Sequence, residues 1–143
     1  MSAVWDSIAE EFLHLYPRGQ RLVAVAGADA ERSRVAADGL AAALTAAGQT
    51  VERAHTADGE EAALRAEVVA PFRATDSDAV LLVSGPGAIV SPSARGMWNY
   101  VLWQLAGDEP PHTAANALVD VTDPAHPTRR FADYCAVPSS FET

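Results

Sequence analysis

The eight residues from Gly27 to Arg34, GADAERSR, are those whose types and position in the chain could do chemistry. They follow an apolar run over 22–26 that has the length and the β-branched residues of a strand. They precede an Ala- and Leu-rich segment whose apolar residues recur at helical spacing, which predicts a helix over 35–47. In a strand–turn–helix unit, backbone N–H groups at the start of the helix can hold a phosphate.

This loop departs from the phosphate-binding pattern GxxxxGK[ST] at every landmark after the first glycine. Counting from Gly27, the second Gly is Arg32, the Lys is Ser33 and the Ser/Thr is Arg34. A long side chain at Arg32 obstructs the close approach of backbone to phosphate. Ser33 cannot supply the charge of the lysine, and a cation at Arg34 would repel Mg²⁺. The altered loop consists of Gly27, Ala28, Asp29, Ala30, Glu31, Arg32, Ser33 and Arg34.

The charges of the loop leave two interpretations open. Arginine binds phosphate well, so Arg32 or Arg34 could replace the missing lysine. Alternatively, both are solvated charges in the first turn of a helix. All ten basic residues of the chain are arginines, so no shifted register of the pattern supplies a lysine.

Composition limits the class of partner and the compartment. A chain of 143 residues with 49% apolar content fits one folded domain. Its net charge of −9 argues against nucleic acid or an anionic membrane as the main partner. No apolar run approaches the roughly 20 residues that span a bilayer. The N-terminus lacks the basic region of a signal peptide, so we expect a cytoplasmic protein.

The chain shows no pattern of metal ligands and has no second cysteine for a disulfide. Its four histidines are scattered without ligand spacing, so we predict no metal site. Cys135 is the only cysteine, and no base lies near it in the sequence. We interpret Cys135 as a packing residue.

Helix and strand patterns alternate along the rest of the chain, which implies a parallel sheet with helices on both faces. The period of residues 95–105 fits either a helix or a strand. Helices are predicted over 2–16 and 59–74, and strands over 51–55, 79–83 and 117–121.

The segment RLVAVAGADAERSRVAADGLAAALTAAGQTVERA resembles the beginning of the uridine-kinase-like P-loop nucleoside kinases of actinobacterial type, which read RLVAVDG-x-x-GAGK[ST] before a similar helix. The resemblance resumes, in the order of the family, at ALRAEVVAPFRA, DAVLLVSG and ANALVDVTDPAHP. It implies an α/β three-layer sandwich with a five-stranded parallel sheet of order 2-3-1-4-5. It also implies a short helical turn over 95–98 with a strand after it. The domain would span 1–143, with the N-terminal helix in 1–20 and a tail over 128–143.

The resemblance also implies where other functional groups of the family would lie. The general base of the kinases aligns with Ala57, and Asp58 follows it; Asp58 could equally be a helix cap. The acid that assists Mg²⁺ aligns with Ser84. Residues Thr122, Asp123 and Pro124 resemble the turn that lies beside the adenine. The substrate-binding insertion and the arginine-bearing lid of the kinases have no counterpart, so the domain is a truncated one.

These departures predict a catalytically inactive, nucleoside-kinase-like protein that serves as a binding or interaction domain. We expect it to need no cofactor and to act as a homodimer or with a protein partner. The alternative is a nucleotide-binding phosphotransferase that uses ATP and Mg²⁺, with Arg32, Arg34 and Asp58 in place of the usual groups. A third possibility is a decaying paralogue that retains no ligand.

Overall fold

β1 (Arg21–Gly27) is a central strand of the sheet in the computed structural model, which describes residues 3–75, 77–112 and 115–130. All seven of its residues are buried, and the strand predicted over 22–26 is confirmed. It pairs in parallel with β3 (Val80–Pro86) on one side and with β4 (Tyr100–Leu105) on the other. The predicted loop after Gly27 therefore leaves the sheet at its centre.

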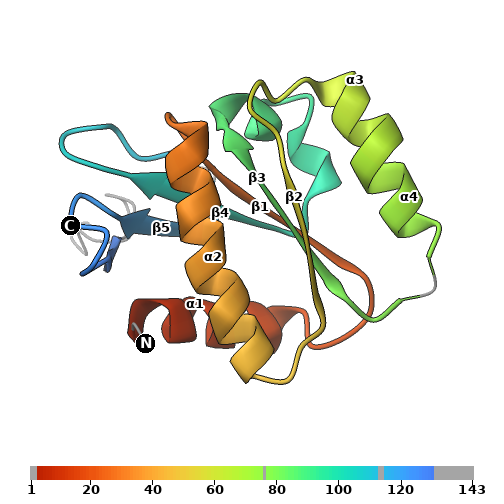
Figure 1. Cartoon of the computed structure of the whole chain (residues 1–143), viewed down its shortest axis with the longest axis horizontal. Coiled ribbons are helices and arrows are strands. Elements are labelled where there is room, and N and C mark those ends of the chain that lie inside the picture. Colours follow the sequence, from red (N-terminus) through yellow and green to blue (C-terminus); the bar gives the residue numbers. More distant parts are fainter. Residues whose placement is uncertain (1–2, 76, 113–114, 131–143) are drawn as a thin grey trace, which may run out of the picture.

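The sheet has six strands in the order β2-β3-β1-β4-β5-β6 (Figure 1). β2 (Val51–His55) and β5 (Ala117–Asp120) extend the parallel part, whereas β6 (Thr128–Arg130) runs antiparallel to β5. The α/β class and the largely parallel sheet are confirmed. The five-stranded sheet of order 2-3-1-4-5 is wrong, because a tight turn closed by the bond from His126 N to Asp123 O reverses the chain and adds a sixth strand.

Helices cover both faces of the sheet, so the predicted three layers are present. α1 (Ala3–Leu15) and α2 (Ala30–Ala46) share one hydrophobic core with residues of β1 such as Val23 and Val25. The alternate residues of the strand face the second core, beneath the helical segment that begins at α3 (Glu61–Leu64) (Figure 1).

That second helical segment contains a π-helical turn. α3 continues into η1 (Arg65–Val69) and then α4 (Ala70–Arg73), and the N–H of Ala70 donates to the carbonyl of Arg65, five residues earlier. Pro71 gives the physical reason: it has no N–H, and its ring crowds the carbonyl four residues before it. The predicted helix thus runs past Pro71 with a wider turn.

Two 3₁₀ helices, η2 (Gly87–Val90) and η3 (Arg95–Met97), connect β3 to β4. The indole N–H of Trp98 donates to the carbonyl of Ile89 at 2.7 Å and holds this connection together. A short helical turn followed by a strand is therefore confirmed for residues 95–105.

Arg21 stabilises the end of the sheet at which β1 begins, opposite the end that carries the turn after Gly27. It is 1% exposed, and its guanidinium donates to the carbonyls of Tyr16, Gly19 and Asp78 and to the amide oxygen of Gln49 at 2.7–2.9 Å. Burial lowers the pKa of this side chain from its ordinary value. These bonds join the segments that enter β1, β2 and β3.

None of the helices within the described ranges has the length and apolar character needed to cross a membrane. Cys135 and residues 131–143 of the predicted tail lie outside the described residues, while 128–130 of that tail form β6.

Candidate functional site

The predicted loop is much shorter than the sequence pattern suggested. Gly27 ends β1 and α2 begins at Ala30, so residues 30–34 are helical and only residues 28 and 29 form the turn between them. Asp29 caps the helix: its Oδ1 accepts from the backbone N–H of Glu31 at 2.9 Å and of Arg32 at 3.0 Å. These bonds, chiefly the one from Arg32, lower the pKa of Asp29. Two of the first-turn N–H groups that could hold a phosphate, those of Glu31 and Arg32, therefore already have a partner.

Gln104 of β4 fills the space beside Gly27. Its side chain is fully buried, and its Nε2 donates to the carbonyl of Asp29 at 3.0 Å and to the hydroxyl of Ser33 at 3.2 Å. A Cβ at Gly27 would lie 2.2 Å from that Nε2. Glycine is required here, because Gln104 approaches its backbone too closely for a side chain to fit.

Arg32 completes this arrangement. Its Nε donates to Oε1 of Gln104 at 2.9 Å, and its Nη2 pairs with Glu109 at 2.6 Å. Glu109 also accepts from the N–H of Ala106 at 3.0 Å, and the hydrogen bond from Arg32 is the main cause of its lowered pKa. We refer to Gln104, Arg32 and Glu109 as the plug, because together they pack against the turn between β1 and α2.

The second arginine of the loop has different partners. Arg34 Nε donates to Glu31 at 2.7 Å, and its Nη1 lies 4.0 Å from Asp38 on the same helix. This pairing raises the pKa of Arg34, mainly through the hydrogen bond to Glu31. Arg34 thus lies along the outside of α2, and the structure does not bring it together with Arg32.

Asp58 lies in the turn after β2. Its Oδ1 accepts from the N–H of Glu60 at 3.1 Å and from the hydroxyl of Thr56 at 3.2 Å. The prediction that Asp58 is a helix cap is wrong, because Glu60 caps α3 by accepting from the N–H of Ala63 at 2.9 Å. Asp58 and Arg32 line different pockets. The residues that the phosphotransferase alternative needs are therefore dispersed in this structure.

Sequence reasoning missed a contact between Ser84 and His55. Ser84 within β3 is the register partner of His55, the last residue of β2, and Ser84 Oγ lies 2.7 Å from His55 Nδ1. A Ser–His contact is the first requirement of a nucleophilic site, but Ser84 is 1% exposed and its hydroxyl is enclosed. The strand register, which the sequence alone does not give, was the signal that would have paired them.

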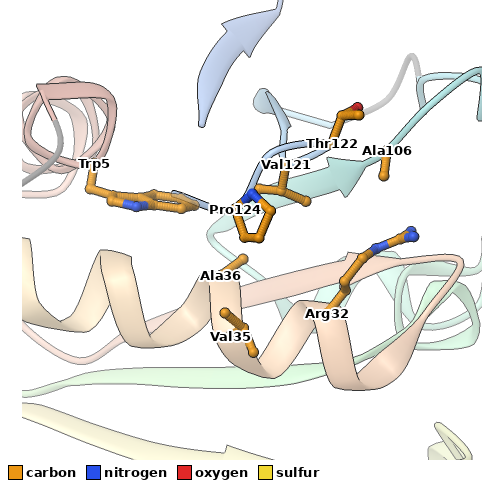
Figure 2. Close-up of a pocket in the computed structure, with 8 residues that line it drawn as sticks. All are labelled: Trp5, Arg32, Val35, Ala36, Ala106, Val121, Thr122 and Pro124. Carbon is orange, nitrogen blue, oxygen red and sulfur yellow. The ribbon is translucent and has the colours of Figure 1, made fainter. Parts of the chain in front are cut away.

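A pocket of about 440 Å³ brings the altered loop and the predicted base-side turn together (Figure 2). Trp5 and Arg32 stand at its opposite ends, with α2 residues on one side and residues after β5 on the other (Figure 2). The residues that line it are Trp5, Arg32, Val35, Ala36, Ala106, Val121, Thr122 and Pro124. The pocket is therefore formed by segments from both ends of the chain.

The polar groups of the base-side turn are already engaged. The hydroxyl of Thr122 donates to Asp120 at 2.6 Å and accepts from the N–H of Gly107 at 2.7 Å. Asp123 accepts from Ala125 N at 3.1 Å, and its contact with His126 lowers its pKa. Thr122 and Pro124 line the pocket, whereas Asp123 does not.

Within residues 3–75, 77–112 and 115–130, no group of three or more His, Cys, Asp or Glu could hold a metal ion. No protein-family model matches the chain, and no curated protein gives a significant match to it.

Proposed function

We propose that this protein is a non-catalytic binding domain built on a nucleoside-kinase-like frame. In this proposal, the part of the frame that would hold ATP phosphates serves as packing, and recognition takes place at the neighbouring pocket. The protein would act alone on its ligand or present it to a second copy or a protein partner.

The plug is the observation that carries the proposal. Phosphoryl transfer depends on donors that hold the transferred phosphate and neutralise its developing charge. Here Asp29 accepts from two N–H groups at the start of α2, Gln104 fills the space beside Gly27, and Glu109 is paired with Arg32. A nucleotide would have to displace a buried amide and an ion pair before it met any of these donors.

Thermal melting of the full chain tests this proposal. We expect no change in Tm with ATP and Mg²⁺, with GTP or with uridine at millimolar concentration. A nucleotide present at 100 times its Kd would stabilise the native state by about 2.7 kcal/mol, which corresponds to roughly 5–10 °C in a domain of this size.

A variant with a restored loop, Arg32→Gly with Ser33→Lys and Arg34→Ser, serves as the comparison. We expect the Tm of this variant to be unchanged by nucleotide as well, because Asp29 and Gln104 still occupy the site. An ATP-dependent shift in the natural chain would contradict the proposal and favour the phosphotransferase alternative, and phosphate transfer from ATP to uridine would then be measured.

A further inference from the structure

The pocket between Trp5 and Arg32 lies beside the plug and shares Arg32 with it. Its volume of about 440 Å³ lies in the range of small-molecule sites. Its walls are mostly apolar, from the indole of Trp5 through Val35 and Ala36 to Val121 and Pro124 (Figure 2). Such a lining favours a ligand with an apolar body.

Val35 is a large apolar side chain of this lining that remains exposed to water. It is 47% exposed, although it lies on the helix that packs against the sheet. Among the described residues, Leu15 is the other large apolar side chain with comparable exposure, at 53%. Leu15 lies outside the pocket lining, whereas Val35 forms part of its floor. A bound molecule would remove Val35 from water.

The polar groups of the lining restrict what that molecule can be. Thr122 already donates one hydrogen bond and accepts another, so it offers little to the edge of a base or a sugar. Arg32 uses Nε and one bond from Nη2 for the plug, and Nη1 makes no hydrogen bond to any described residue. The pocket thus presents unused N–H donors at one end, where a ligand oxygen would accept.

The charge near Arg32 restricts the ligand further. Glu109 lies 2.6 Å from the guanidinium and is held as a carboxylate, so it offsets the charge of Arg32. The chain as a whole carries −9. A group with several negative charges, such as a triphosphate, would be repelled by Glu109 and by the net charge of the chain. A neutral oxygen acceptor would not be repelled by either.

We infer that this pocket binds a small molecule with an apolar, ring-bearing body and one uncharged oxygen acceptor, the ring lying between Trp5 and Pro124 and the oxygen at Arg32. This inference rests on the proposed function as a binding domain, and it adds the chemical class of the ligand.

The probe for the test is 4-phenylbutyramide, which has a ring, an apolar linker and a terminal amide oxygen. Binding is followed in the full chain by Tm and by tryptophan fluorescence during titration, with Trp5→Phe to assign the fluorescence change. The carboxylate 4-phenylbutyrate has the same shape and carries a charge. We expect the amide to raise Tm at millimolar concentration and to bind at least as tightly as the carboxylate.

Two matched variants test whether the probe binds in this pocket. Val35→Glu puts a charge on the pocket floor, and Leu15→Glu makes the same change at the other exposed apolar side chain. We expect Val35→Glu to weaken binding at least tenfold and Leu15→Glu to leave it unchanged. Equal binding by the two variants, or no binding by the natural chain, would overturn the inference. Tighter binding of the carboxylate would overturn the assignment of an uncharged acceptor.

The outcomes for the two proposals are separable. If the amide probe does not bind, the ligand class inferred for the pocket is contradicted, and the result of the nucleotide measurement is unaffected. An ATP-induced shift that 4-phenylbutyramide abolishes would contradict the proposed function, because the pocket would then hold part of a nucleotide.

Discussion

The indole of Trp5 on α1 lies against Gly39 on α2, at a point where a side chain would collide with it. A Cβ at Gly39 would lie 2.4 Å from Trp5 Nε1 and 2.6 Å from Cε2. The absence of a side chain therefore lets α1 approach α2 closely, and it places the indole at one end of the pocket.

We expect Gly39→Ala to lower the free energy of unfolding, because Trp5 must move to admit the new methyl group. Alanine is the better helix former by about 1 kcal/mol, so the collision has to outweigh that gain. In a Trp5→Ala background the collision is removed, and the same substitution should stabilise by about 1 kcal/mol. Urea denaturation of the four proteins measures both effects. Stabilisation by Gly39→Ala in the natural chain would contradict the close contact.

Gln104 should make a large contribution to stability for a polar residue. Gln104→Ala removes a fully buried side chain, leaves Arg32 Nε without its acceptor, and removes one of the hydrogen bonds made by Asp29 O and by Ser33 Oγ. We expect a loss of about 2–4 kcal/mol in urea denaturation. Gln104→Met preserves the volume and removes the hydrogen bonds, so it should cost about 1–3 kcal/mol. A loss well below 1 kcal/mol for both variants would show that the amide contributes little.

Glu109 should make the free energy of unfolding fall as the pH is lowered into the acid range. Arg32 lowers its pKa in the folded protein, so Glu109 contributes stability that is present above the unfolded value of about 4.3 and is lost as the pH falls through the folded value. Glu109→Gln should therefore flatten the decline of the unfolding free energy below about pH 5. Glu52→Gln, at an exposed position on β2, is the control and should leave the decline unchanged.

Tyr100 should make the free energy of unfolding fall as the pH rises into the alkaline range. Burial, followed by the hydrogen bond to Glu11, raises its pKa, so the neutral phenol is favoured in the folded state. Its contribution is fully present below the unfolded pKa of about 10 and is lost as the pH rises beyond it. The free energy of unfolding should fall between about pH 9 and pH 11 more steeply in the natural chain than in Tyr100→Phe. Equal slopes would contradict the assignment.

The regular elements were largely predictable because local sequence determines them. The apolar run over 22–26 and the segment 51–55 correspond to β1 and β2, and Gly48 follows α2 with φ +92°. The strand after residue 98 depended on the resemblance, because its period fits either class. The boundary of α2 was wrong by five residues, since Asp29 provides a cap that the comparison with a phosphate loop had concealed.

Features that depend on long-range contacts were not predictable. β6 is three residues long with the sequence TRR, which carries no strand pattern, and it exists because the turn after β5 returns the chain to the sheet. Gln104 was unremarkable within the strand YVLWQL until β4 was placed beside Gly27. The plug is therefore a property of the strand order rather than of any motif.

The two outer strands of the sheet have a bearing on how the protein could associate. An outer strand offers unpaired backbone groups to another chain, and short or charged outer strands discourage such pairing. β6 has three residues, and β2 exposes Glu52 and Arg53. Growth of the sheet by addition of a foreign strand is thus disfavoured at both sides. A partner would have to engage side chains on the helical layers, and mixing with it should leave the strand content measured by infrared spectroscopy unaltered.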